Sequence, residues 1–369
     1  MKKTLIALAA VAATSASFAQ VTLSGEFAWG FLAQSKNGTE TSGGGIDTSQ
    51  VTFSAKEDLG SGMSIAYKAQ LNLGEYAANG GSGPNADDQS LTLVTPFGGL
   101  SLLTYKPGTW VMGAAGSGTW YGLDGKNLGA RAARDGYALT VPVMDGLTVT
   151  GAFTEPAGST GEGAGNAGLS GTPTPTGSVF QGIYNISGKY ANGPMVLQAG
   201  YLSFSNSGAT DATTDNVTRL GATYDLGVAK AGAAIQMAKL SGGGTDNETA
   251  LALTAPLAAN LSIAATYAIR DTKVSDTSFL AGATGTRNGY QLQAQYNLSK
   301  RTYVIGSYGA WTGQTFTAAS AESWAVLQKD DTKTGGKAGT IQKTDAKAQT
   351  IVNHTKDSSL TAITLVHDF

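Results

Sequence analysis

The chain has 369 residues, with 24 Lys and Arg against 26 Asp and Glu, and it contains no Cys. The slight acidic balance argues against a nucleic-acid partner, which would require a basic surface. The absence of Cys excludes disulfides and also zinc sites built from thiolates. The 51 Gly residues follow no three-residue period, which excludes a collagen-like fibre.

Residues 1–19 have the pattern of an export signal. Lys2 and Lys3 supply a positive start, residues 5–13 form a short apolar run, and residues 17–19 are a small-x-small cleavage sequence. The apolar run is too short to span a bilayer, and the alternative is a buried helix. We predict a signal peptide over 1–19, with the mature chain beginning at Gln20.

From residue 20 onward, apolar and polar residues alternate with a period of two, which is typical of amphipathic strands. No later stretch approaches 18 apolar residues, so no transmembrane helix is expected. The alternation predicts sixteen strands, near 20–33, 49–58, 62–74, 89–95, 99–106, 134–142, 145–153, 183–191, 194–205, 216–226, 228–238, 247–256, 259–270, 287–298, 301–312 and 359–369.

Short turns alternate along the chain with long polar or Gly-rich loops. The predicted long loops are 34–48, 75–88, 107–133, 155–182, 271–286 and 313–358. This rhythm is typical of a membrane barrel, whose two rims carry connections of different length. Alternation by itself fits a sandwich equally well, but sixteen strands are too many for one sandwich, and aromatic residues near strand ends fit interfacial girdles. We therefore predict an all-β fold, a single sixteen-stranded antiparallel transmembrane β-barrel over 20–369.

Several segments spread over the chain also carry a family resemblance: residues 20–25, 56–63, 296–302 and 307–309, and the final strand that ends on Phe369. In these segments the sequence resembles the trimeric general porins of Gram-negative bacteria, in the form common among β-proteobacteria. The resemblance implies an outer-membrane homotrimer that contacts membrane lipid and lipopolysaccharide. It also implies a water-filled channel for passive diffusion of small hydrophilic solutes and inorganic ions, with no catalysis and no cofactor.

In this family the third external loop folds into the barrel and narrows it, and by strand order that loop is 107–133 here. The family usually carries an acidic cluster on this loop, opposite arginines on the wall. This loop has only Asp124 as an acid, with Lys126 and Arg131 beside it. Without an acidic cluster, the electric field across the lumen that is usual in this family is in doubt. Two Trp and a Tyr in the loop indicate that it packs on the wall through aromatic contacts.

Residues out of phase with the apolar ones are expected to face the lumen, and most of the charged ones are basic. They are Lys56, Lys68, Lys106, Arg134, Lys189, Arg219, Lys230, Arg270 and Arg287, with Glu26 as the clearest acid. Basic groups in a water-filled constriction favour anions, so we predict a modest anion preference. The residues expected to line the constriction are Lys68, Lys106, Asp124, Arg131 and Arg134.

Other patterns carry little chemistry. The G-x-G-x-x-G match at 163–168 lies in a Gly-rich loop instead of a strand–helix turn, and His354 and His367 have neither metal nor triad spacing. No catalytic or metal site is expected. Three alternatives stay open: a substrate-specific channel for an organic anion, a structural or adhesive outer-membrane barrel, and a secreted soluble β-rich enzyme or lectin.

Overall fold

Almost all of the described chain is β-strand. The computed structural model describes residues 20–36, 38–73, 85–120, 123, 126–129, 133–156, 181–206, 214–240, 243–273, 285–313, 315–318, 351–354 and 357–369. The predicted signal peptide, residues 1–19, lies outside these ranges. Among the described residues, no helix is both long and apolar enough to cross a membrane.

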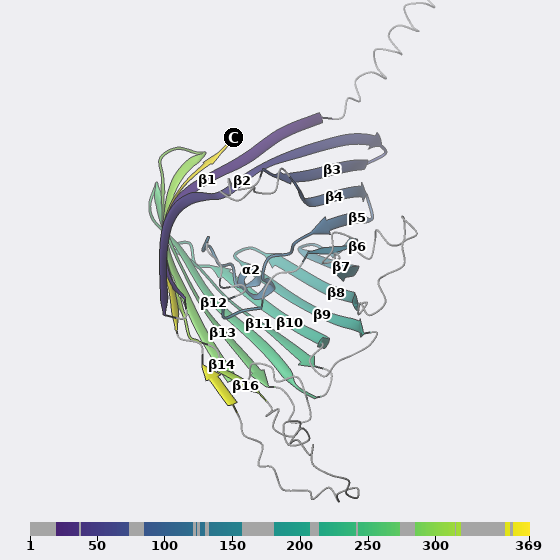
Figure 1. Cartoon of the computed structure of the whole chain (residues 1–369). Helices are drawn as coiled ribbons and strands as arrows, with labels where there is room; N and C mark the ends of the chain where they lie inside the picture. The colour runs from purple at the N-terminus through teal and green to yellow at the C-terminus, as the bar shows by residue number, and fades with distance from the viewer. Residues whose placement is uncertain are drawn as a thin grey trace, which may run out of the picture.

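Sixteen strands close into one antiparallel barrel, which confirms the predicted fold (Figure 1). Each barrel strand pairs with the next barrel strand along the chain, β15 with β18 included, and β1 also pairs with β18 to complete the ring. The strands are β1 (Gln20–Lys36), β2 (Thr39–Gly60), β3 (Met63–Asn72), β4 (Asn85–Thr95), β5 (Gly98–Tyr105), β6 (Arg134–Met144), β7 (Leu147–Pro156), β8 (Gln181–Asn192), β9 (Met195–Asn206), β10 (Thr214–Asp225), β11 (Lys230–Leu240), β12 (Thr245–Ala258), β13 (Leu261–Lys273), β14 (Gly285–Asn297), β15 (Thr302–Trp311) and β18 (Ser358–Asp368).

Large apolar side chains point outward and small or polar ones point inward. On β13, Ile263 and Tyr267 are 39% and 40% exposed, whereas Ala264 and Ala268 on the opposite face are 7% and 0% exposed. A sandwich would bury its large apolar residues between two sheets. The observed arrangement is the reverse, as expected for a barrel whose outer face meets lipid.

The structure corrects the predicted loop over 34–48. β1 continues to Lys36 and β2 begins at Thr39, and the two pair without interruption from Ser35–Glu40 down to Trp29–Ile46. This segment has no apolar alternation because it is rich in Gly, Ser and Thr, yet backbone pairing does not require apolar side chains. Part of the predicted loop 313–358 is also paired, as β16 (Thr315–Ala318) with β17 (Ile351–His354).

The last residue of the chain helps to join β18 to β1. The backbone N–H of Phe369 donates to the carbonyl of Gly25 at 3.0 Å, and the N–H of Gly25 donates back at 2.9 Å. A Cβ on Gly25 would lie 2.3 Å from Cζ of Phe369 and 2.7 Å from the backbone oxygen of Gln50. Only glycine therefore leaves room for the terminal ring at the closure.

We expect Gly25→Ala to destabilise the barrel by about 1–3 kcal/mol, because the added methyl overpacks the closure. Urea unfolding in detergent, followed by Trp fluorescence, measures the change. Gly43→Ala on β2 is the matched control, since a Cβ there meets nothing within 4 Å. Equal stability of the two variants would contradict this account of the closure.

Candidate functional site

The segment between β5 and β6 lies inside the barrel and packs against its inner wall. Its short helix, α2 (Trp110–Ala114), contacts β10, β11 and β12 (Figure 1). Val111, Met112 and Ala114 of this helix are buried. A helix of five residues is not stable alone, so wall contacts must hold it. The predicted infolding of loop 107–133 is confirmed for the described residues.

Small residues on the inner wall form the surface against which this loop packs. Ala234, Ala250, Ala252 and Ala268 form one buried cluster with α2 and the loop residues Leu123 and Leu128. Glycines let the loop approach more closely still. A Cβ on Gly232 would lie 2.3 Å from the backbone oxygen of Ala115, and one on Gly289 would lie 2.7 Å from Oδ1 of Asn127.

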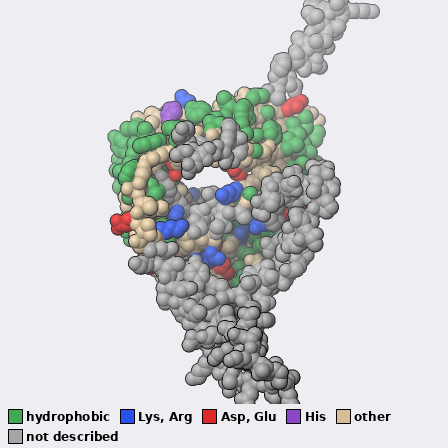
Figure 2. All heavy atoms as spheres, viewed as in Figure 1, with side chains coloured by type: hydrophobic (Ala, Val, Ile, Leu, Met, Phe, Trp, Pro, Cys, Tyr) green, Lys and Arg blue, Asp and Glu red, His purple; other side chains and the backbone are tan. Residues whose placement is uncertain are grey.

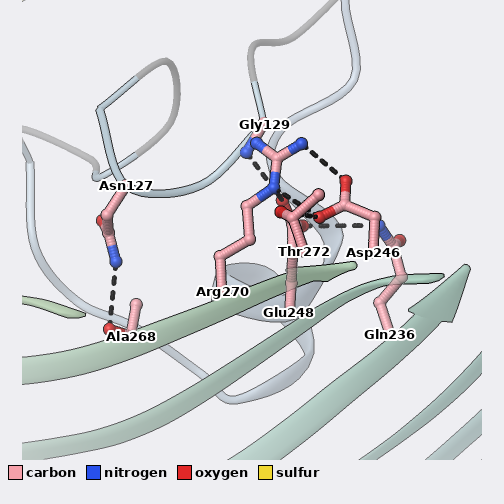
Figure 3. Close-up of polar contacts among 8 residues, drawn as sticks. All are labelled: Asn127, Gly129, Gln236, Asp246, Glu248, Ala268, Arg270 and Thr272. Atoms are coloured by element: carbon pink, nitrogen blue, oxygen red, sulfur yellow. Dashed lines mark hydrogen bonds and ion pairs between the residues drawn. The ribbon is translucent and has the colours of Figure 1, made fainter. Parts of the chain in front are cut away.

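Hydrogen bonds fix the loop at several points along β12–β14. The N–H of Gly129 donates to Oε1 of Glu248 at 2.6 Å, and Nδ2 of Asn127 donates to the carbonyl of Ala268 at 3.0 Å (Figure 3). The N–H of Trp120 donates to Oε1 of Gln293 at 2.5 Å. Buried backbone groups need such partners, so these wall side chains determine where the loop can lie.

Trp120 ties the loop to another part of the wall. Its Nε1 donates to Oδ2 of Asp47 on β2 at 2.9 Å, and its ring meets Tyr303 of β15 edge-on, with 6.5 Å between ring centroids. A second aromatic, Trp110, lies under the guanidinium of Arg219 at 5.3 Å. The loop is thus fastened to β2 and β15 as well as to β10–β14.

A row of charged and polar side chains crosses the inner wall in register. Arg219 on β10 is paired with Gln236, which is paired with Glu248, then Arg270, then Arg287 on β14. Nε of Arg219 donates to Gln236 at 2.7 Å. Arg270 makes a two-point ion pair with Asp246 at 2.7 and 2.5 Å and lies 3.6 Å from Glu248 (Figure 3).

Acidic groups lie on another sector of the barrel. Glu26 on β1 is in register with Asp368 on β18, and Asp47 lies on β2. In ring order, β1 and β10 are seven strand steps apart out of sixteen, so the Arg219 end of the row is almost opposite β1. Figure 2 shows an opening through the barrel with Lys and Arg side chains below it and carboxylates at its upper edge. The negative charge opposite the arginines therefore comes from carboxylates of the wall, because the sequence of the loop has no acidic cluster.

The structure separates the residues predicted to line the constriction. Lys68 lies with Lys56 in a hollow of about 300 Å³ on the inner wall of β1–β4. Arg134 lines a different cavity, beside the start of the loop. Lys106 is exposed, and its backbone N–H donates to Oδ1 of Asp88 at 2.7 Å. Asp124 and Arg131 lie outside the described residues.

Sequence reasoning missed the acceptors of the charged row, Glu248 and Asp246. Both occupy inward positions next to the basic residues that the alternation had placed in the lumen. Glu248 precedes the buried Ala250 by two positions, so strand phase could have placed its carboxylate on the inner face. No group of three His, Cys, Asp or Glu among the described residues could hold a metal ion.

An antiparallel barrel with an outward apolar face and a polar, narrowed lumen defines a membrane channel of the outer-membrane type. The chain matches the model of the Gram-negative porin family over residues 4–314 and belongs to that family. It is therefore an outer-membrane channel.

Solved structures with the same fold include an anion-selective porin from Comamonas acidovorans, at 19% identity and a TM-score of 0.61, which covers 95% of this chain and 100% of that one. Outer-membrane expressed OmpT of Vibrio cholerae matches at 13% identity and a TM-score of 0.62, over 95% and 98% of the two chains. The comparison with curated proteins gives no match in sequence.

We expect Gly232→Ala to push α2 off the wall, because the new methyl would overlap the backbone oxygen of Ala115. The free energy of unfolding should fall by about 1–3 kcal/mol. The displaced helix would move into the lumen and should lower the single-channel conductance. Gly309→Ala is the control, since a Cβ on that glycine makes its nearest contact at 3.5 Å. Unchanged conductance in Gly232→Ala would show that this contact does not set the position of the loop.

Proposed function

We propose that this porin lets small hydrophilic solutes and inorganic ions diffuse passively, with a modest preference for anions. The observation that carries the proposal is the row on the inner wall, in which Arg219, Arg270 and Arg287 lie in register beside the infolded loop. The loop limits the size of the solute. The arginines set the sign of the charge that passes more easily.

The charge balance of the row favours anions only moderately. Arg270 is paired with Asp246 and lies near Glu248, so much of its charge is compensated. Arg134 adds positive charge in the cavity that Arg219 and Arg270 also line, and Lys68 adds positive charge on the inner wall of β1–β4. The Comamonas acidovorans relative is described as anion-selective, and we propose the same sign of selectivity here on the strength of these side chains.

A second candidate function is a channel specific for an organic anion, which the cavity beside Arg134 favours. We propose no catalytic role and no cofactor.

From the family resemblance we further propose a homotrimer that contacts outer-membrane lipid and lipopolysaccharide through the outward apolar face. A structural or adhesive barrel would not conduct, so the conductance experiment below separates that alternative.

Planar-bilayer recording of the purified protein across a salt gradient tests the proposal. The expected result is conductance steps in groups of three. The sign of the reversal potential should show that anions permeate more easily than cations. Combined removal of charge, Lys68→Gln with Lys106→Gln and Arg134→Gln, should lower the anion preference. A unit charge about 8 Å from the ion path in water contributes ~0.5 kcal/mol, or about twofold in permeability for each charge. An unchanged reversal potential in the triple variant would refute the roles given to these three residues.

We also propose that residues 1–19 are removed during export. The mass of the purified outer-membrane protein should equal that of residues 20–369. A variant with Ala19→Gln, which replaces the small residue before the predicted cleavage point, should retain the extra mass. A native mass that includes residues 1–19 would contradict the proposal.

A further inference from the structure

A cavity of about 540 Å³ lies between the first residues of the infolded loop and the inner wall of β5–β13. Its wall combines guanidinium groups with a continuous apolar surface. Ligand pockets in proteins have this size, and they place a few polar groups on a mostly apolar lining. The cavity has these dimensions, and its lining is about as polar as it is apolar, which suits a small molecule with both a charged group and a hydrocarbon part.

The apolar surface is unusual for the inside of a water-filled barrel, where inward residues are normally polar. Leu202, Val217 and Ala238 follow one another in register across β9, β10 and β11. Together with Ile183 they form a buried cluster, and Phe204 packs against it. All five residues line the cavity. They offer a surface for the hydrocarbon part of a solute, which ions would not use.

Polar atoms without partners lie at the same cavity. Among the described residues, Nη1 of Arg134, Oδ1 of Asn185 and Oγ1 of Thr109 are buried and have no hydrogen-bond partner. A buried guanidinium N–H normally has an acceptor, because leaving it unpaired is costly. A carboxylate is the acceptor that matches a guanidinium best.

The charges around the cavity leave room for one such anion. Three arginines line it, Arg134, Arg219 and Arg270, against two carboxylates, Asp246 and Glu248. Arg270 is paired with Asp246. The excess is one positive charge, which matches a monocarboxylate. Trp110 under Arg219 adds an aromatic face to the lining.

We infer that this cavity binds a small aromatic monocarboxylate, with its carboxylate on Arg134 and its ring on the Ile183–Leu202–Val217–Phe204 surface. The inference rests on the proposed channel function, because the ligand would be a solute held on its way through the lumen. Simple anions such as chloride or acetate have the charge without the ring and would pass with little retention.

Benzoate is the probe, and the unmodified protein in a planar bilayer is the first test. Benzoate should reduce the current of a background salt in a saturable way. Acetate, which lacks the ring, and benzyl alcohol, which lacks the charge, should not. A reduction by acetate equal to that by benzoate, or one that does not saturate, would overturn the inference.

Two variants test the two halves of the site. Val217→Thr keeps the shape of the side chain and replaces a methyl with a hydroxyl, so the half-blocking concentration of benzoate should rise about fourfold. Arg134→Gln should raise it by about tenfold or more, since a charged hydrogen bond is lost. Arg301→Gln is the control that removes the same charge, because Arg301 is exposed in the turn between β14 and β15 and does not line the cavity. It should leave the benzoate block unchanged, and a loss of block in this variant would overturn the inference.

The same recordings distinguish this site from the proposed function. Anion preference in the salt gradient without saturable benzoate block would refute the site and leave the channel proposal intact. Saturable block by benzoate in a channel without anion preference would support the site and refute the proposed selectivity. Val217→Thr should change only the block, because it alters no charge.

Discussion

Closure of the sheet on itself is the constraint on which the rest of the structure depends. In a lipid environment every backbone N–H and C=O must find a partner within the protein, and an open sheet edge would leave a row of them unpaired. β1 therefore pairs with β18 on one side and with β2 on the other. Closure turns one face of every strand toward lipid and the other toward an enclosed lumen. The inverted distribution of side chains, with Tyr267 outside and Ala268 inside, follows directly.

The enclosed lumen then has to accommodate the loop between β5 and β6. A water-filled passage offers few apolar contacts, so the wall supplies a local patch of Ala and Gly that α2 can cover. Next to that patch the wall changes to charged residues, and the backbone of Gly129 bonds to Glu248 at the boundary. Packing and charge are thus adjacent on the same strands, and the position of the loop decides which arginines stay accessible to solutes.

Much of the barrel could be predicted from the sequence because period-two alternation is a local signal. β13 and β14 alternate over most of their length, and their predicted ranges fall within about two to three residues of the observed ones. The β1–β2 hairpin could not be predicted, because the Gly, Ser and Thr residues of β2 there give no apolar phase to follow. Alternation also placed Arg219 and Arg270 on the inner face, where the structure has them.

The contacts between the infolded loop and the wall could not be predicted in the same way. Glu248 meets Gly129 across 119 positions of sequence, and Trp120 meets Asp47 across 73. Such contacts depend on how deeply the loop enters the barrel, which no local pattern encodes. The five residues chosen for the constriction were taken from one stretch of sequence around the loop and from β3. The observed charged row instead runs across five consecutive strands, β10–β14, so its members lie far apart in the sequence.

The separation of opposite charges on the barrel wall has a consequence for how solutes travel. Glu26, Asp47 and Asp368 lie on β1, β2 and β18. On β10–β14 the three arginines outnumber the two carboxylates beside them, Asp246 and Glu248. We expect the field between these two sectors to turn a neutral molecule with a dipole, such as an amino acid zwitterion, until its ends face the opposite signs. Its cross-section in that fixed orientation, and not its average size in free rotation, then decides whether it fits beside the loop.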